Sequence, residues 1–162
     1  MVTAIEEQHR GSLHAHVLIG TDLELKICED VERLISCEIP SDSDLKTLVR
    51  SFMIHGPCKQ GHACRLNKTG ACKRGFPRSY QQKTEIPEQG YIKPKRTNPI
   101  EGGETIVYEN GTTVTNSDVI TYSPILLKEL RSHVNVEIIR GPSQIIKYFF
   151  KYMSKGTTTK LF

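Results

Sequence analysis

The stretch HRGSLHAHVLIG, residues 9–20, places two histidines one residue apart inside a β-type segment. Together with VTAIEEQ, residues 2–8, and the Arg-Gly-Ser turn signal between the two segments, it predicts a β-hairpin. Because successive side chains of a strand point to opposite faces, we expect His14 and His16 on the same face. The other face is expected to pack into the core, and it carries Ala15, Val17 and Ile19.

Five later segments have the patterns of regular structure. The predicted elements are a helix in SDSDLKTLVRSFMIH (41–55) capped by Ser41 or Ser43, a hairpin at Asn110-Gly111, a helix in SPILLKELRSH (123–133), a strand in HVNVEII (133–139), and a helix in PSQIIKYFFKYMSKG (142–156) with Ser143 as cap and Gly156 as stop. The pattern predicts an α+β fold with a central antiparallel sheet and helices packed on one of its faces.

Bulk composition favours one globular domain over residues 1–162. Apolar residues make up 37% of the chain, and no run approaches the roughly 18 apolar residues that cross a bilayer. We therefore expect an intracellular protein without a membrane partner. The formal charge of +4 is compatible with an anionic partner.

The histidine pair is a candidate catalytic metal site. Residues i and i+2 of a strand can both reach one cation above the sheet, and the neighbouring strand offers Glu6 or Gln8 as a third ligand. Two imidazoles and one oxygen would leave coordination positions open for a substrate. The alternative is an ordinary pair of solvent-facing histidines.

The last predicted helix interleaves phenols and ammonium groups. Tyr148 and Tyr152 are four residues apart and share one helical face, and Lys151 follows Tyr148 by three. A phenol has a pKa near 10 and is a poor nucleophile at neutral pH unless a nearby cation favours phenolate. Aromatic residues at helical spacing are more often core residues, which is the expectation for Ile145, Ile146, Phe149 and Phe150.

Read together, these motifs resemble a known family. IEEQHRGSLHAHVLIG followed far downstream by IIKYFFKYMSKG resembles the HUH-type Rep endonuclease domain of Helitron rolling-circle transposases, the Helitron helicase-like N-terminal domain. FMIHGPC, GACKRGFPRSY, GYIKPKR and YSPILLKELRSHVNVEI occur in the order found in that family. The family domain has a further strand and helix ahead of the hairpin, so we expect an N-terminally truncated domain.

The resemblance implies a metal-dependent endonuclease and strand transferase acting on single-stranded DNA in rolling-circle transposition. It implies that His14 and His16, with Glu6 or Gln8, bind Mg²⁺ or Mn²⁺, and that Tyr148 and Tyr152 are nucleophiles that form 5′-phosphotyrosine. Lys151 is the candidate for stabilising phenolate or phosphate charge. The expected partner is the helicase domain of the full-length transposase, because no GxxxxGK[ST] motif occurs here. The resemblance also implies a nuclear location.

A second candidate metal site lies in a Gly-, Lys- and Arg-rich insertion, residues 55–103. Three thiolates and one imidazole would form a structural zinc site that orders this segment; the alternative is free thiols in a mobile loop. The candidate ligands are Cys58, Cys64 and Cys72, with His55 or His62 in the fourth place. Cys28 and Cys37 are expected to pack.

Two further functional hypotheses stay open. The chain could be a non-catalytic, zinc-stapled nucleic-acid-binding module, a degenerate transposon fragment that uses the basic residues of the insertion. It could also be a hydrolase in which His14 and His16 activate water and the tyrosines are structural. The nuclease predicts a covalent protein–DNA adduct, whereas the hydrolase predicts cleavage without one.

Overall fold

The computed structural model describes residues 1–7, 13–58, 64, 71–153 and 158–161. These residues form a mixed α+β structure with small antiparallel sheets and four α-helices. None of the helices in this described part combines the length and hydrophobicity needed to span a membrane. The chain divides into two compact units: Met1–Glu24 with Pro87–Tyr91 and Ile139–Phe162, and Leu25–Ile86 with Ile92–Ile138. The expectation of a single domain stays a prediction.

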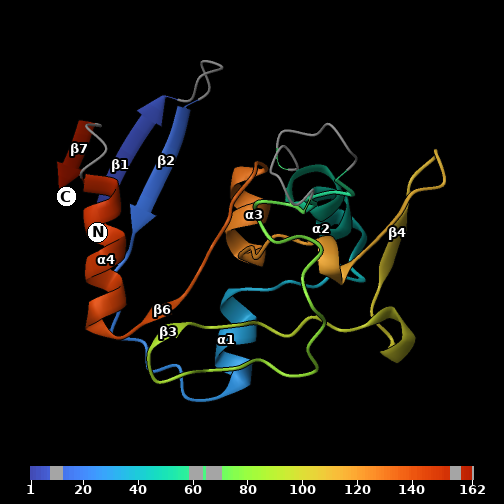
Figure 1. Ribbon diagram of the computed structural model, residues 1–162, viewed down its shortest axis with the longest axis horizontal. Coiled ribbons are helices and arrows are strands. Elements are labelled where there is room, and N and C mark those ends of the chain that lie inside the picture. Colours follow the sequence, from blue (N-terminus) through green and yellow to red (C-terminus); the bar gives the residue numbers. More distant parts are fainter. Residues whose placement is uncertain (8–12, 59–63, 65–70, 154–157, 162) are drawn as a thin grey trace. The chain divides into compact units, whose positions relative to one another are not determined.

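In the first unit, β1 (Val2–Glu7) and β2 (Leu13–Leu18) form the predicted antiparallel hairpin. β7 (Thr158–Leu161) pairs with the other edge of β1, which gives the strand order β2-β1-β7 (Figure 1). The register places Glu6 opposite His14. The prediction of a hairpin is therefore confirmed.

The prediction of which face of this hairpin is buried is wrong. Val17 and Ile19 are 48% and 63% exposed, and Ala15 is exposed as well. Ala4, which is 6% exposed, pairs with His16, and opposite residues of an antiparallel ladder share a face. The more buried face is thus the one that carries the imidazoles. The prediction failed because a period-two pattern separates the two faces of a strand without specifying which of them the rest of the chain covers.

The first unit also contains α4 (Pro142–Met153) and a short ladder between β3 (Gly90–Tyr91) and β6 (Ile139–Arg140). The predicted C-terminal helix is confirmed, although it begins at Pro142 and so already contains Ser143; Gly156 lies outside the described residues. The expected core packing of its apolar residues is wrong for Ile145, Ile146 and Phe150, which are 38%, 53% and 65% exposed. The predicted strand over 133–139 is limited to its last residue, because residues 133–138 have no ladder partner.

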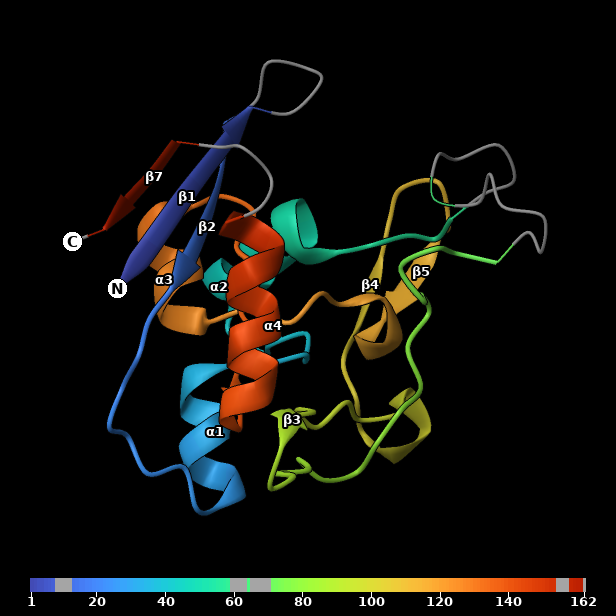
Figure 2. The same cartoon turned by 60° about the vertical axis from the view of Figure 1, so that its left-hand side comes forward.

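Helices and short turns dominate the second unit (Figure 2). Its elements are α1 (Cys28–Leu34), α2 (Ser43–Leu48), the π-helical turn η1 (Val49–Met53), the 3₁₀ turns η3 (Pro99–Glu101) and η4 (Asn116–Asp118), the strands β4 (Thr105–Val107) and β5 (Thr113–Thr115), and α3 (Pro124–Leu130). Both the predicted hairpin at Asn110-Gly111 and the predicted helix after Ser123 are confirmed.

The apolar stripe of α2 and η1 forms the larger of two cores in this unit. The buried cluster comprises Ile39, Leu45, Leu48, Val49, Met53, Ile106, Val114, Val119, Tyr122 and Leu127. The cap of α2 is Asp42, whose side chain accepts a hydrogen bond from the Leu45 amide at 2.8 Å, instead of Ser41 or Ser43. Aspartate serves this role because its carboxylate accepts from a backbone amide that has no partner within the helix.

A buried polar pair fastens the loops around this core. Asn116 is fully buried; its side chain accepts from the Ile39 amide at 2.7 Å and donates to the Thr97 carbonyl at 3.0 Å. The Arg96 guanidinium, 7% exposed, donates to the carbonyl oxygens of Asn116 and Val119. These bonds fix η4, and the carbonyl of Asp118 in η4 in turn holds the amide of His55, a member of the His/Cys cluster described next.

Candidate functional site

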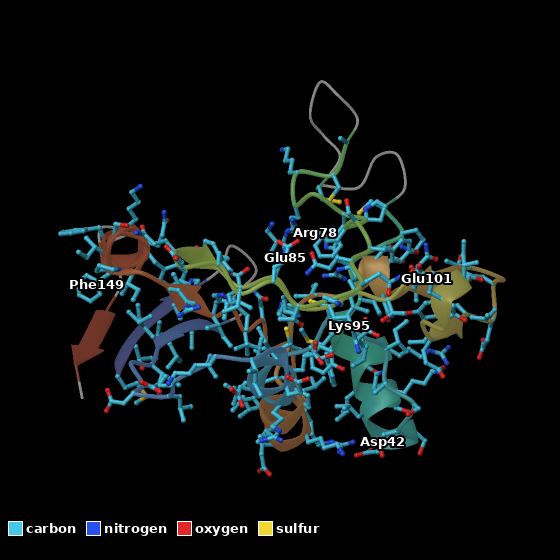
Figure 3. All side chains as sticks on the ribbon, turned by 90° about the horizontal axis from the view of Figure 1, so that it is seen from below. Asp42, Arg78, Glu85, Lys95, Glu101 and Phe149 are labelled. Carbon is cyan, nitrogen blue, oxygen red and sulfur yellow. The ribbon has the colours of Figure 1, made fainter. Side chains whose placement is uncertain are left out.

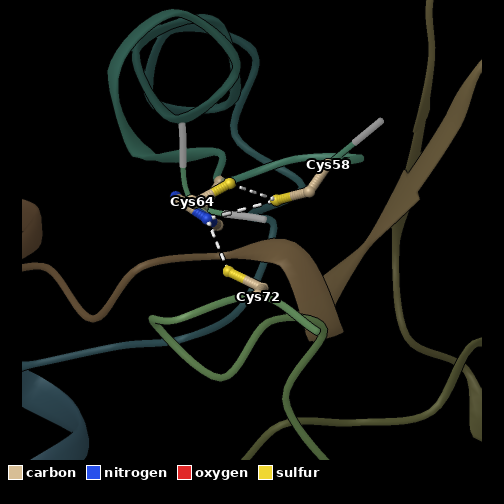
Figure 4. Close-up of side chains that lie close together, drawn as sticks. Cys58, Cys64 and Cys72 are labelled. Atoms are coloured by element: carbon tan, nitrogen blue, oxygen red, sulfur yellow. Dashed lines mark hydrogen bonds between the residues drawn. The ribbon is translucent and has the colours of Figure 1, made fainter. Parts of the chain in front are cut away.

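Three sulfur atoms and one imidazole meet in the second unit (Figure 4). His55 Nε2 lies 3.2 Å from Cys72 Sγ and 3.3 Å from Cys58 Sγ, and Cys64 Sγ lies 3.3 Å from Cys58 Sγ. All four ligand atoms lie within 4.8 Å of one another. The cluster could hold a metal ion, as the sequence predicts.

The backbone holds these ligands from several directions. The His55 amide donates to the Asp118 carbonyl at 2.8 Å, next to an antiparallel bridge between Ile54 and Val119. The Lys73 amide donates to the Cys64 carbonyl at 2.7 Å. The ligands are therefore tied both to η4 and to each other before any ion is considered.

The turn after Cys72 is shaped to receive a thiolate. The amide of Gly75 donates to the Cys72 carbonyl at 2.9 Å, and Gly75 has φ +71°, a left-handed conformation that favours glycine. Burial raises the pKa of Cys72, but hydrogen bonds from the amides of Phe76 and Arg74 and from His55 outweigh it and lower the pKa to about 6. Amide groups aimed at a sulfur stabilise its charged form.

The neighbouring thiols oppose the ionisation of a second sulfur. Burial, followed by the contacts with Cys64 and Cys72, raises the pKa of Cys58 to about 11. Three thiolates this close together require a cation between them, and binding of a metal would release their protons. The electrostatics of the cluster are those of a cation-binding site.

The imidazole of this cluster comes from His55. His62, the alternative fourth ligand, lies outside the described residues, so that part of the prediction stays untested. The prediction of Cys28 and Cys37 as packing residues is confirmed: Cys28 Sγ donates to the Thr84 carbonyl at 3.3 Å, and Cys37 is 1% exposed. Burial raises the pKa of Cys37, which keeps that thiol neutral.

Sequence reasoning missed the residues that position His55. The Phe76 ring lies against the His55 imidazole, with ring centroids 4.5 Å apart. The guanidinium of Arg78 lies 5.0 Å from the centroid of the same Phe76 ring. Arg78 is also bonded through its amide to the Ser117 carbonyl at 2.8 Å. The signal in the sequence was the run CKRGFPR, which reads as an irregular basic loop until the fold shows what its aromatic ring touches.

The second candidate site lies on the hairpin of the first unit. The rings of His14 and His16 have centroids 4.5 Å apart at 69°, and both side chains are half-buried. Their strand partners on the same face of the ladder are the positions of Glu6 and Ala4. The ladder therefore brings the predicted histidine pair together, with the position of Glu6 directly opposite His14.

The other predicted residues of this site belong to the same unit or lie outside the described part. Tyr148 is half-buried on α4, which shares the unit with the hairpin. Gln8 lies outside the described residues, and so do the side chains of Glu6, Lys151 and Tyr152. The grouping of α4 with the hairpin is what a joint site requires.

Comparisons with known proteins add no family to this picture. A scan against protein-family models finds no match to the chain, and no curated protein matches it. Function is therefore argued from the two candidate sites.

Proposed function

We propose that this chain is a metal-dependent endonuclease and strand transferase for single-stranded DNA of the HUH Rep type. The observation that carries the proposal is the β1–β2 register, which sets the position of Glu6 opposite His14 beside two imidazoles in contact. Further support comes from the tyrosine helix α4, which belongs to the same compact unit. The finer architecture, a central sheet with helices on one face, is part of this proposal.

Two imidazoles and one oxygen ligand would leave coordination positions open on a divalent cation, where a phosphate oxygen could bind. His14 and His16, with Glu6 or Gln8, would hold Mg²⁺ or Mn²⁺, which supplies polarisation of the scissile phosphate. The remaining chemistry belongs to the chain itself. The oxygen of Tyr148 or Tyr152 attacks phosphorus, the bond from phosphorus to the 3′-oxygen breaks, and the departing oxygen takes a proton.

The covalent product explains why tyrosine suits strand transfer. The 5′-phosphotyrosine link conserves a phosphodiester-type bond, so a 3′-hydroxyl can reverse the attack and rejoin strands without another energy source. Two tyrosines allow two successive transfers. Lys151, three residues after Tyr148, would stabilise the phenolate or the phosphate charge.

A denaturing gel of the chain with 3′-end-labelled single-stranded DNA and Mn²⁺ tests this proposal, because the 5′-phosphotyrosine link keeps the 3′ fragment on the protein. Labelled protein should appear with the native chain and disappear in Tyr148→Phe/Tyr152→Phe. Tyr91→Phe, which removes a phenol from β3 of the same unit, is the matched control and should keep the adduct. An adduct that survives the double change refutes the assignment, and cleavage without an adduct would favour the hydrolase.

For the cysteine cluster we propose a structural Zn²⁺ site. Zn–S bonds of about 2.3 Å in a tetrahedron place neighbouring ligand atoms roughly 3.5–3.8 Å apart. The observed separations of 3.2 and 3.3 Å are a few tenths of an ångström shorter than this range, and all four ligand atoms lie within 4.8 Å of one another, so small shifts would bring them to tetrahedral spacing; a Cys₃His set closes the coordination sphere. Native mass spectrometry should detect one zinc per chain.

A second candidate function rests on this cluster. A zinc-stapled module that binds nucleic acid without cleaving it needs only the second unit, where the ligands and the basic run after Cys72 are found. It predicts no adduct with Mn²⁺ and loss of DNA binding when the thiols are chelated. The helicase partner and the nuclear location implied by the resemblance belong to the first proposal.

A further inference from the structure

Positive charge is concentrated in the segment of the sequence that contains the ligands of the His/Cys cluster. Residues 45–84 contain nine lysines and arginines and no aspartate or glutamate, whereas the complete chain has a formal charge of only +4. Lys46 pairs with Glu104, and Arg50 lies over the Tyr108 ring. Those two cations therefore have roles within the fold.

Three other cations follow the ligand Cys72 directly. Lys73, Arg74 and Arg78 are exposed, and within the described part of the chain none of them forms an ion pair. Arg78, which is labelled in Figure 3, belongs to the segment that follows Cys72. We call these three residues, together with Tyr80, the basic turn.

An aromatic side chain accompanies these charges. Tyr80 is 39% exposed, and its hydroxyl is fixed by a 2.8 Å hydrogen bond with Thr115 Oγ1. A ring held at one end and open to solvent is a surface on which an unstacked base can lie, and base–aromatic stacking is tolerant of sequence. Nearby cations would contact the phosphates on either side.

We propose that the basic turn is a binding surface for single-stranded nucleic acid, separate from the hairpin site, whose conformation depends on metal in the Cys₃His cluster. The inference rests on the proposed handling of single-stranded DNA and adds the residues that hold the strand. An acidic protein would use the cations but would have no use for the exposed Tyr80 ring, which is why nucleic acid is the favoured partner.

The metal dependence follows from the contacts of the turn. Arg74 and Phe76 donate their amides to the sulfur of Cys72, and the Phe76 ring contacts both the imidazole of His55 and the guanidinium of Arg78. Removal of the ion would release two ligands on which this stack is built. The spacing of the cations would then no longer be fixed, and binding would fall.

The test measures the binding of labelled oligothymidylate by fluorescence anisotropy. The protein is the full chain with Tyr148→Phe and Tyr152→Phe, loaded with zinc, and no Mg²⁺ or Mn²⁺ is added. This background cannot form the adduct, so the result is independent of whether the native chain cleaves DNA. Lys73→Gln/Arg74→Gln/Arg78→Gln should weaken binding about 10-fold or more and reduce the salt slope by about 2, since each phosphate contact to a single strand contributes about 0.7.

The matched control removes three lysines elsewhere in the same unit, Lys46→Gln/Lys93→Gln/Lys128→Gln, and so has the same net charge; Lys93 and Lys128 are exposed and Lys46 is half-buried. It should bind within about twofold of the parent, because phosphate contacts and not net charge set the salt slope. Equal losses in the two triple variants would overturn the proposal. Lys73→Gln/Arg74→Gln, which leaves the Arg78–Phe76 stack intact, repeats the test if the first variant loses zinc.

Two further arms separate the partner classes and the role of the metal. Tyr80→Ala should weaken binding about 5-fold or more while Tyr80→Phe keeps it, as expected for loss of one stacked base. Chelation of zinc should abolish the difference between the parent and the triple variant, and zinc should restore it. Competition by polyglutamate as strong as that by oligothymidylate, or unchanged binding after chelation, contradicts the proposal.

Discussion

His55 Nε2 and Cys72 Sγ lie 3.2 Å apart although 17 positions separate the two residues in the chain. That contact closes a loop, and none of its described residues, 56–58, 64 and 71, belongs to either hydrophobic core of the second unit. Closing a loop of this length costs chain entropy, and a ligand that binds only the folded form offsets it. A metal at this point would therefore stabilise the second unit by offsetting the cost of closing this loop.

Replacement of one sulfur ligand tests that role. Loss of a hydrogen-bond partner of a metal ligand lowers metal affinity by about 10- to 100-fold. Cys72→Ser removes a ligand itself and should lower zinc affinity by more than that. Cys28→Ser, which changes a thiol of the same unit outside the cluster, should leave the affinity unchanged. Competition with a chromophoric chelator measures both. Similar affinities in the two variants would mean that the cluster does not bind the ion.

The left-handed turn at Gly75 is a second point of sensitivity. An alanine there would adopt φ near +71° at a cost of about 1–2 kcal/mol, and its Cβ would lie 3.4 Å from the Arg78 guanidinium. Gly75→Ala should reduce the free energy of unfolding by about that amount and weaken zinc binding about 5- to 30-fold if the ion binds only the folded turn. Gly20→Ala, where a Cβ meets nothing within 4 Å, is the control.

Arg96 should be among the least replaceable residues of the second unit. Arg96→Met leaves the buried carbonyl groups of Asn116 and Val119 without their donor, at about 1–3 kcal/mol for each group. The free energy of unfolding in urea should fall by about 2–5 kcal/mol. Arg50→Met removes an exposed cation that lies 4.9 Å above the Tyr108 ring and should cost less than about 1 kcal/mol. Equal costs would show that the Arg96 bonds contribute nothing special.

The cap of α2 gives the chain a pH dependence whose sign can be stated. The hydrogen bond from the Leu45 amide, aided by the charge of Lys128, lowers the pKa of Asp42 below its usual value. A carboxyl group whose pKa is lowered on folding stabilises the folded state. This stabilisation is complete above the unfolded pKa of about 3.9 and is lost as the pH falls through the folded pKa.

Asp42→Asn keeps an acceptor at the cap but does not titrate. The melting temperature of the native chain should therefore fall relative to that of Asp42→Asn as the pH is lowered from about 5 to about 2. Thermal melts of both proteins over this range measure the difference. A difference that stays constant with pH would show that the Asp42 carboxylate does not stabilise the fold.

Local patterns predicted most of the elements, because turn residues and helical periodicity act over a few positions. The Asn110-Gly111 turn, Pro124 at the start of α3 and the stripe on α2 were all read correctly. The burial of the two hairpin faces was predicted wrongly. Val17 and Ala4 are both apolar, and only their exposure in the folded chain differs. Which face is covered is a property of the whole chain.

The residue types of the His/Cys cluster were predictable from the sequence, whereas the residues that support its histidine were not. Three cysteines and nearby histidines within a short segment indicated a site, and His55 is the histidine found there. Its support by Phe76 and Arg78 could not be read from spacing, because the contact depends on the turn at Gly75 and on η4, which lies some forty residues further along the chain.

The central claim is that a phenol of α4 becomes covalently joined to DNA, and the most direct test identifies the joined residue. The chain is incubated with single-stranded DNA and Mn²⁺, digested with nuclease and protease, and the peptides are examined by mass spectrometry. A nucleotide attached through phosphate to Tyr148 or Tyr152 is the predicted result. A nucleotide on any other residue, or cleaved DNA with every peptide unmodified, would contradict it.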